Sequence, residues 1–517
     1  MTTAALPFLR SLLIYSICVP LALVLGYLIS TPYDLTSFTV VGLVLSFLLI
    51  PLLLRWHHVW LIAAWNMSVV LFFLPGRPVV WLPLAWISML ISFVGYILNR
   101  KHKFLLVPQL TRPLILMIVV TLVTAKARGG LGLQAFGSDT FGGKRYLIIL
   151  TSIVGFFAIT SHRIPRQRVP LYVALYFLSA ATIAIGELAV VVTPGFYFLF
   201  YLFPVGSAGL QAMAADPSAT TGIGTRLSGL ASAGTAAYLL MLCRYGIQEL
   251  FSFRRLGRLC FFLFFLFVAM LGGFRSIMIL FLLTFALLFY LEGLMRSSLM
   301  PAFLIMAVLG ATAIVPLADR LPLTLQRSLS FLPLPIDPMV KAGADASTEW
   351  RVQMWKHVLP EVPEYLLLGK GYSFSPKDLA ATWIHGVDST GTEGAELAGD
   401  YHNGPLSVII PFGIPGTVVF LWFLAAGCKL LRSNYLYGDP AFRRVNSFLL
   451  AYFLAKIIFF LAVFGSLYSD LPGFIGLLAL SISINGGVEK TAVIPQPKFV
   501  INKPLVPGSV STRPARA

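Results

Sequence analysis

The stretch PLSVIIPFGIPGTVVFLWFLAAGCKL, residues 405–430, carries a single charge, Lys429, in 26 positions. About 20 apolar residues suffice for a helix to cross the hydrocarbon core of a bilayer, so this stretch predicts a membrane-spanning helix. The whole chain of 517 residues has the same character, with 58% hydrophobic residues, 11% charged residues and a mean hydropathy of +0.86. A soluble chain needs about 25% charged residues. The composition therefore excludes a cytosolic enzyme, a disordered chain and a secreted disulfide scaffold.

Fourteen apolar segments follow one another along the chain, and several are shorter than a full span. They predict an all-α, polytopic membrane helix bundle with about 12–14 transmembrane helices. The segments are Ser11–Ser30, Ser37–Leu54, Val59–Leu74, Val79–Leu98, Pro113–Thr124, Tyr146–Ser161, Leu171–Val192, Leu230–Cys243, Leu259–Leu271, Ile277–Leu291, Pro301–Leu317, Pro405–Leu430, Val445–Phe464 and Leu471–Ile484.

The distribution of basic residues predicts which side of the membrane each connection faces. The net charge of +18 would suggest nucleic acid in a soluble protein. Here 23 Lys and Arg residues fall on the connections that share a side with the N-terminus, against 7 on the other side when one long loop is set aside. The positive-inside rule then places both termini inside. The basic excess is a topology signal, and we expect no nucleic-acid partner.

The long loop, residues 318–404, is the only extended segment without a predicted span, and this topology places it outside. It divides the chain into an N-terminal bundle (1–317), the loop itself, C-terminal helices (405–485) and a tail (486–517) rich in Pro, Lys and Arg that we expect to be disordered. Within the loop, Thr348–Val358 has helix-forming composition, with Thr348 and Glu349 at its start and Pro360 after its end. A loop this long is seldom idle, although a solvated cap without chemistry is the simpler interpretation.

Several arginines lie next to apolar segments on the outer side. Arg226 precedes the eighth segment in TRLSG, Arg275 stands in the turn GGFRS, and Arg128 opens a glycine-rich connection. The planar guanidinium matches phosphate oxygens and is less costly to dehydrate than ammonium. Together such arginines could clamp a pyrophosphate, whereas each alone could simply extend to lipid headgroups.

His402 stands in GDYHNG, where the loop returns to the membrane. An imidazole accepts a proton near neutral pH, so His402 is a candidate general base, with Asp400 and Asn403 near enough in sequence to orient it. A surface histidine without a role is the alternative. The chain has no HExxH metal motif, no P-loop, no GxSxG and no GxGxxG, and the sequence predicts neither a metal site nor a cofactor.

Glu187 and Lys456 are the two charges that lie well inside predicted helices. Such residues are functional candidates in a membrane, and they could pair with each other or carry a proton as in a transporter. A structural ion pair explains them equally well.

The order of these elements resembles the O-antigen ligase and O-antigen polymerase superfamily of bacterial membrane glycosyltransferases. The resemblance covers about residues 225–420 and rests on the Arg226 segment, the Arg275 turn, and the outer loop with Glu349, Trp350, Arg351, Trp355, LGKG at 368–371 and YHN at 401–403, followed by PFGIPG at 411–416. Phe274 replaces the usual Ser before the arginine, Pro411 stands where an acidic residue is common, and the Asn-Pro often found after the first arginine is absent. These departures leave the subfamily open.

The resemblance implies a GT-C-like bundle in the bacterial inner membrane, with a large, mostly helical periplasmic loop. It implies a metal-independent, inverting transferase without a cofactor, which moves a glycan from undecaprenyl pyrophosphate to an acceptor sugar hydroxyl. The acceptor would be lipid A core for a ligase of lipopolysaccharide, or another lipid-linked repeat for a polymerase of O-antigen or exopolysaccharide. Arg226, Arg275 and, with lower rank, Arg351 would hold the pyrophosphate, and His402 would activate the acceptor. Trp350 or Trp355 could contact sugars.

Two other functions fit a polytopic protein of this size. A lipid-linked glycan flippase or another secondary transporter would use charges at the midplane and often shows internal repeats; the chain shows no repeat and only Glu187 and Lys456 as such charges. A scaffolding membrane protein would tolerate single changes in the outer loop.

Overall fold

The computed structural model of the protein describes residues 35–98, 104–133, 142–192, 194–205, 227–374 and 399–488, together with a few residues between 16 and 27. In these ranges every regular element is a helix, and the one β-bridge joins Val70 to Val79. Of the predicted first helix, Ser11–Ser30, only residues 16, 18–23 and 26–27 are described, and all of these are helical. The predicted disordered tail lies outside the described residues except for 486–488. The all-α prediction is confirmed.

Twelve of the fourteen predicted segments correspond to helices of the described chain. Nine helical stretches are long and apolar enough to cross a membrane: α3 (Trp81–Leu98), α4 (Pro108–Arg128), α5 (Gly143–Thr160), Arg166–Val190, α9 (Ser228–Leu250), Leu299–Arg320, α17 (Gly404–Tyr437), Pro440–Ala462 and α19 (Leu467–Asn485). Two shorter apolar helices, α10 (Leu256–Met270) and α11 (Arg275–Leu291), and one bent pair within α2 (Leu35–Ala64) complete the set. The chain is a polytopic membrane helix bundle.

The predicted span Val59–Leu74 is wrong. Helix α2 bends at Trp56 and ends at Ala64, and the chain then runs through turns to α3. Pro75 and Pro78 in this connection cannot donate backbone hydrogen bonds, and each disfavours a helical residue before it. The apolar residues here line a surface connection rather than a second span.

The predicted helix Leu171–Val192 is interrupted. Helix α6 (Val169–Leu178) passes through a 3₁₀ turn, η3 (Ser179–Thr182), into α7 (Ile183–Val192). The Ser179 hydroxyl donates to the carbonyl of Tyr176 at 3.0 Å, and the Thr182 hydroxyl donates to that of Ser179 at 2.8 Å. Hydroxyl groups that bind the preceding turn in this way compete with the regular helix.

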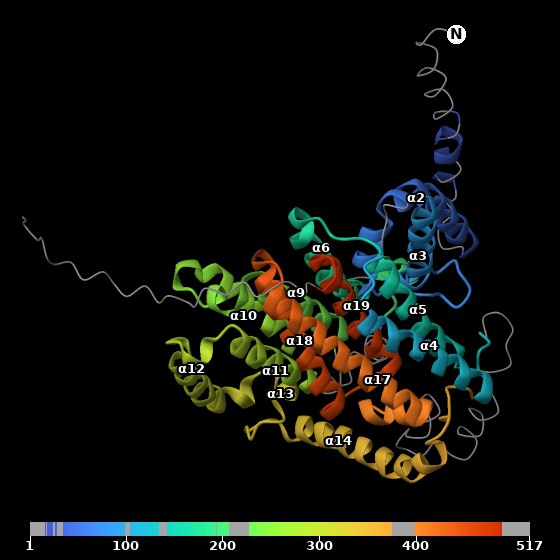
Figure 1. The fold of residues 1–517 in the computed structure, drawn as a ribbon. Coiled ribbons are helices and arrows are strands. Elements are labelled where there is room, and N and C mark those ends of the chain that lie inside the picture. The colour runs from blue at the N-terminus through green and yellow to red at the C-terminus, as the bar shows by residue number, and fades with distance from the viewer. Residues whose placement is uncertain are drawn as a thin grey trace, which may run out of the picture.

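The C-terminal helices form the centre of the bundle (Figure 1). Helix α19 packs along α5, α17 packs along α4, and α18 (Arg443–Ala462) packs along α11 and α17. Most residues of α19 are fully buried, among them Leu471, Phe474 and Leu478. Segments far apart in sequence therefore share one apolar core.

The outer loop forms a helical layer across one end of the bundle (Figure 1). It contains α13 (Leu323–Leu329), α14 (Pro338–Val358) and the 3₁₀ helix η8 (Leu359–Tyr365). The predicted start at Thr348 is wrong, because α14 begins ten residues earlier. The Asp337 carboxylate caps it by accepting from the backbone N–H groups of Met339 at 2.8 Å and Val340 at 3.3 Å, and Pro338 occupies the first turn. The predicted end before Pro360 is confirmed.

A break in α17 ties this layer to the bundle. Gly413 has φ +63°, and Pro415 has no N–H, so the carbonyls of Ile410 and Pro411 lack their usual partners in the helix. Lys370 N–H donates to Ile410 O at 2.7 Å, and Gly371 N–H donates to Pro411 O at 3.0 Å. The Ile414 N–H in turn donates to Leu366 O at 2.7 Å. The glycine turn of the loop thus completes the hydrogen bonding of a membrane helix.

We predict that Gly369→Ala loosens this attachment. Gly369 has φ +77°, and a Cβ there would lie 2.1 Å from Pro411 O. The backbone strain alone costs about 1–2 kcal/mol. Purified variant protein should unfold at a lower midpoint temperature and be cut faster by trypsin at Lys370. Gly343→Ala in α14, where a Cβ meets nothing within 4 Å, is the control and should match or exceed the wild type. Equal midpoints for Gly369→Ala and wild type would contradict the attachment.

Candidate functional site

Five side chains from four elements meet where the outer layer covers the bundle. Arg275 is the first residue of α11, and Trp350 and Arg351 lie on α14. His402 lies two residues before α17, and Phe464 lies in the turn between α18 and α19. These positions span almost 200 residues of sequence, and the attachment of the loop to α17 helps to bring them together.

His402 is held by the way the chain enters α17. Its backbone has φ +48°, which is rare for a residue with a side chain and is typical of functional sites. The Asn403 side chain accepts from Leu406 N–H at 3.1 Å and caps α17. Gly404 lies so close to α18 that a Cβ would be 2.1 Å from Phe460 O. Asn403 therefore caps the helix start, and its predicted part in orienting the imidazole stays a prediction.

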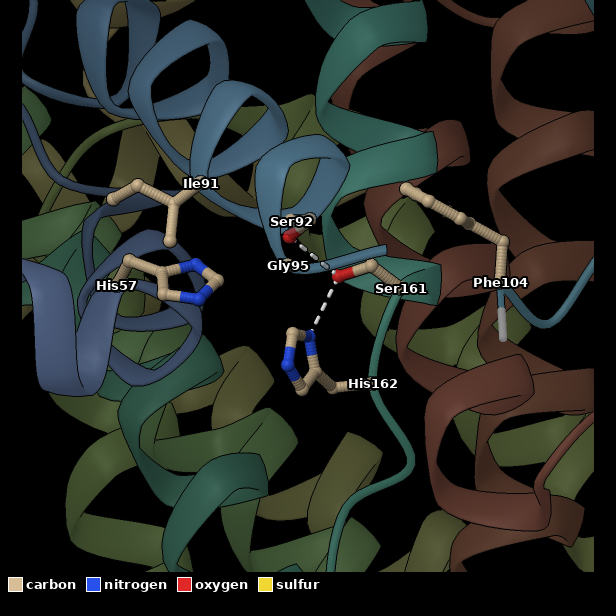
Figure 2. A pocket seen from close by; sticks show the side chains of 7 residues that line it. All are labelled: His57, Ile91, Ser92, Gly95, Phe104, Ser161 and His162. Atoms are coloured by element: carbon tan, nitrogen blue, oxygen red, sulfur yellow. Dashed lines mark hydrogen bonds between the residues drawn. The ribbon is translucent and has the colours of Figure 1, made fainter. Parts of the chain in front are cut away.

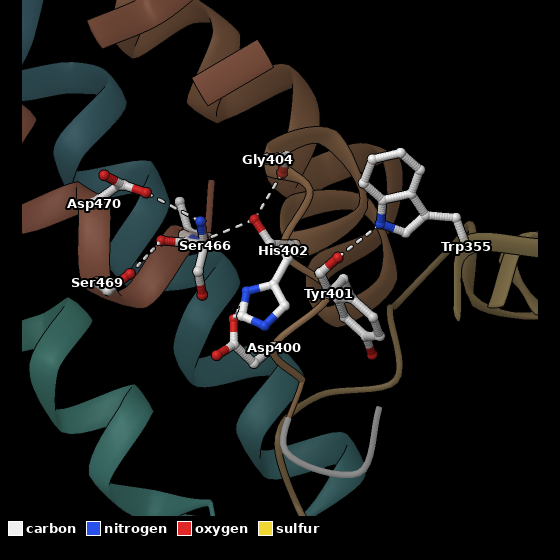
Figure 3. A network of polar contacts seen from close by, with 10 residues as sticks. Trp355, Asp400, Tyr401, His402, Gly404, Ser466, Ser469 and Asp470 are labelled. Carbon is white, nitrogen blue, oxygen red and sulfur yellow. Dashed lines mark hydrogen bonds and ion pairs between the residues drawn. The ribbon is translucent and has the colours of Figure 1, made fainter. Parts of the chain in front are cut away.

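The imidazole of His402 lies between one carboxylate and two aromatic rings. Its Nδ1 is 3.6 Å from Asp400 Oδ1, and Figure 3 shows the carboxylate next to the ring. Phe464 stacks on it with centroids 5.1 Å apart and an interplanar angle of 28°, and the Trp350 ring lies at 5.3 Å. The side chain is 26% exposed. A half-buried imidazole with an adjacent carboxylate suits proton transfer.

Two arginines lie close together near this histidine. Arg275 Nη2 donates to the carbonyl of Ala344 at 2.8 Å and to the hydroxyl of Thr348 at 3.1 Å, both on α14. The guanidinium carbon of Arg351 lies 5.6 Å from the Phe464 ring centroid. Burial, and then the positive charge of Arg275, lower the pKa of Arg351. Within the described ranges, no salt bridge joins either arginine to a carboxylate. Two neighbouring guanidinium groups that pair with no described carboxylate have the charge and the donors that suit an anion.

The other two predicted arginines, Arg226 and Arg128, are not part of this pair. Arg226 lies outside the described residues. The next residue, Leu227, contacts the Arg275 turn, because a Cβ on Gly272 would lie 3.0 Å from Leu227 O. Arg128 binds the outer layer, since its Nε donates to Gly369 O at 2.8 Å. Arg128 thus stabilises the attachment of the loop to the bundle.

The two loop tryptophans have separate roles. Trp355 Nε1 donates to the carbonyl of Tyr401 at 2.8 Å (Figure 3), and with Met354, Val358 and Ile410 it belongs to a small apolar core beneath the site. Trp350 is the tryptophan that faces His402. Trp350 is therefore better placed than Trp355 to contact a sugar.

Sequence reasoning missed Phe464 and Arg145. Phe464 ends an apolar run and carries no signal by which to distinguish it. Arg145 precedes the apolar run Tyr146–Ser161 on the side predicted to face outside, as Arg275 precedes its own apolar run. This shared position could have identified Arg145 as a candidate site residue. Its guanidinium lies 5.1 Å from the ring of Tyr468 and 5.6 Å from that of Tyr372.

The two charges inside predicted helices do not pair with each other. Glu187 accepts from the Ser228 hydroxyl and from Leu230 N–H at 3.3 Å, at the start of α9. A carboxylate is favoured at this end of a helix. Lys456 Nζ lies 3.6 Å from Asp470 Oδ1, and Asp470 also accepts from Ser466 N–H at 3.0 Å (Figure 3). Both charges have local partners that fix helix starts, and a mutual ion pair is ruled out.

The sequence was compared with families and with curated proteins. Residues 260–421 match the sequence model of a family described as O-antigen ligase, which confirms the resemblance to the O-antigen ligase and polymerase superfamily over this part of the chain. The match ends within one residue of the predicted region and includes Arg275, Arg351 and His402. It begins after Arg226, so that segment is not part of it. No curated protein matches the chain. Four of the five side chains of the candidate site thus lie inside the matched region, and Phe464 lies after its end.

We predict different effects of replacing the two tryptophans by phenylalanine. Trp355→Phe keeps the ring but loses the hydrogen bond to Tyr401 O, which should cost about 1 kcal/mol of unfolding free energy. Trp350→Phe keeps a ring against His402 and against the same small core, and it should cost less unfolding free energy than Trp355→Phe. Thermal unfolding of the purified variants measures both effects, and a larger loss for Trp350→Phe would contradict the assignment.

Proposed function

We propose that this multi-pass membrane protein, similar to O-antigen ligases, transfers a glycan from undecaprenyl pyrophosphate to a hydroxyl group of an acceptor sugar. One observation carries the proposal: two neighbouring arginines, which form no ion pair with a carboxylate in the described part of the chain, lie near a histidine that itself lies 3.6 Å from a carboxylate. The arginines suit a leaving diphosphate, and the histidine suits an attacking hydroxyl. The family match to residues 260–421 supports the same reaction class.

The arginines act on the leaving group. As the bond between the anomeric carbon and the diphosphate oxygen breaks, negative charge grows on that oxygen. Guanidinium groups fixed before the reaction stabilise this charge at little reorganisation cost. Arg275 is fixed by its two hydrogen bonds to α14, and Arg351 lies against Phe464. We include Arg226 as a third contact on sequence grounds, because it directly precedes Leu227 beside the Arg275 turn.

His402 acts on the acceptor. Its imidazole takes the proton of the acceptor hydroxyl while the oxygen attacks the anomeric carbon from the side opposite the diphosphate. Undecaprenyl diphosphate leaves, the configuration at that carbon inverts, and the imidazolium returns its proton to water. The Asp400 carboxylate, 3.6 Å away, stabilises the imidazolium. These residues supply the charge and the base, so the proposed mechanism needs no metal or cofactor.

The proposed location is the bacterial inner membrane, with both termini in the cytoplasm and the site at the periplasmic face. The positive-inside pattern supports this orientation. The donor's polyprenyl chain would remain in the bilayer while its diphosphate reaches the outer ends of α11 and α14. Lipid A core and another lipid-linked repeat both offer a sugar hydroxyl, so we propose a ligase or a polymerase of surface polysaccharide.

A flippase or transporter is less well supported. That interpretation depended on Glu187 and Lys456, and both have local partners at helix starts. Arg275 and Arg351, which form no ion pair within the described ranges, lie at one end of the bundle, where a group-transfer site would be expected.

We predict that His402→Ala abolishes surface glycan at normal protein levels. Loss of a general base lowers the rate by about 10²–10⁴-fold, so lipid-linked precursor should accumulate on the periplasmic side. His357→Ala, an exposed histidine on α14, is the matched control and should keep normal glycan. Accumulation of precursor on the cytoplasmic side of the His402→Ala strain would instead favour a flippase.

We also predict that Arg275→Lys and Arg351→Lys are strongly impaired. Lysine keeps the charge but loses the planar pair of donors. Transfer assayed with purified donor should fall by at least about tenfold. Arg320→Lys changes an exposed arginine of the same loop and should retain normal transfer. Near-normal transfer in both of the first two variants would contradict the diphosphate clamp.

A further inference from the structure

A second polar site lies between α2, α3 and the end of α5. It is a cavity of about 160 Å³ lined by His57, Ile91, Ser92, Gly95, Phe104, Ser161 and His162. Figure 2 shows the two imidazoles and the Ser161 hydroxyl around one open space. None of these residues takes part in the proposed transfer.

The polar groups of this cavity are fixed by one another. The Ser161 hydroxyl lies 2.7 Å from His162 Nδ1 and 2.9 Å from the Ser92 hydroxyl. His57 Nδ1 lies 2.8 Å from the Ser88 hydroxyl, which leaves Nε2 as its other ring nitrogen for a ligand. His57, Ser92 and Ser161 are all at most 7% exposed. The Ser161 hydroxyl donates its own proton to the carbonyl of Ala158 at 2.6 Å, so it accepts from Ser92 and His162. The imidazole N–H groups are therefore the donors that the recess can offer to an acceptor such as a phosphate oxygen.

The cavity lies a membrane thickness away from the candidate transfer site. Gly142, which precedes α5, contacts the backbone of Tyr372 in the outer layer. Ser161 directly follows the other end of this 18-residue helix, a length of about 27 Å at 1.5 Å per residue. On the proposed topology this end faces the cytoplasmic leaflet, where anionic lipids gather.

An apolar groove continues from the polar cavity. It has a volume of about 930 Å³ and is lined by Met89, Phe93, Tyr96, Ile97, Phe104, Leu106 and Phe157. Phe104 lines both spaces, so they adjoin. Phe93 and Tyr96 are 49% and 47% exposed, on the surface that a bilayer would cover. A polar recess joined to an apolar groove matches a molecule with a small polar head and a hydrocarbon chain.

The donors in the recess favour an anionic head. Two imidazoles line it, and among the described residues neither space is lined by Asp or Glu. We propose that this site binds an anionic phospholipid. Its phosphate lies among His57, Ser92, Ser161 and His162, and an acyl chain lies along the groove. On the proposed topology the recess faces the cytoplasmic leaflet, where such lipids gather.

Gly95 provides a direct test. It lines the recess, and a Cβ there would meet nothing within 4 Å, so a larger side chain fills the space without a backbone clash. We expect full-length Gly95→Phe, purified in detergent, to bind phosphatidylglycerol at least about tenfold more weakly than wild type in native mass spectrometry. Gly95→Ala, which leaves most of the space open, is the matched control and should bind within about twofold of wild type.

His162→Phe gives an independent variant. It preserves a ring against His57, whose centroid lies 5.3 Å from that of His162, but removes both nitrogens. We expect the same loss of phosphatidylglycerol as in Gly95→Phe. Phosphatidylcholine with the same acyl chains should bind wild type weakly, and glycerol phosphate, which lacks the chains, should not bind at the same concentration.

Three results would overturn the proposal. The first is equal binding of phosphatidylglycerol to wild type, Gly95→Phe and His162→Phe. The second is binding of phosphatidylcholine as tight as that of phosphatidylglycerol. The third is displacement of phosphatidylglycerol by a polyprenyl phosphate at a much lower concentration, which would assign the site to a lipid carrier instead.

Discussion

The carbonyl groups of Ile410 and Pro411 need hydrogen-bond donors that α17 itself does not supply. The break at Gly413 and the missing N–H of Pro415 leave both groups unsatisfied in a buried region, where each would cost about 1–3 kcal/mol. The backbone of Lys370 and Gly371 provides the donors. The outer layer is therefore part of the membrane bundle, and its position follows from the hydrogen bonding of one helix.

This attachment determines the geometry of the candidate site. With residues 366–371 fixed against α17, the small core around Met354 and Ile410 holds α14 over the end of the bundle. Arg351 and Trp350 on α14 then reach Phe464 and His402. Arg275, at the start of α11, joins these residues because α14 supplies its two hydrogen-bond acceptors. The two guanidinium groups repel each other in the unliganded protein. On the proposed function, a bound diphosphate would relieve this repulsion.

The sequence predicted the bundle well, because segment length and apolar composition are local properties. The two wrong predictions, the span Val59–Leu74 and the start of α14 at Thr348, have local causes as well. Hydropathy alone continues the predicted span beyond Ala64, where α2 ends, and Pro75 and Pro78 keep the end of that apolar run out of a helix. The Asp337 cap starts α14 before its helix-forming composition becomes evident. His402, Arg275 and Arg351 were recognised because charge near an apolar run and residue order are visible in one dimension. Phe464 was missed because its importance comes from two contacts across 62 and 113 residues, which no local pattern records.

The most direct test of the account is an experimental structure of the protein with undecaprenyl pyrophosphate bound in lipid nanodiscs. The account predicts that the diphosphate lies between Arg275 and Arg351, with guanidinium nitrogens about 2.7–2.9 Å from its oxygens. It also predicts open space for an acceptor sugar between the diphosphate, Trp350 and His402. A diphosphate bound at the opposite end of the bundle, or one at the outer end that contacts neither arginine, would contradict it.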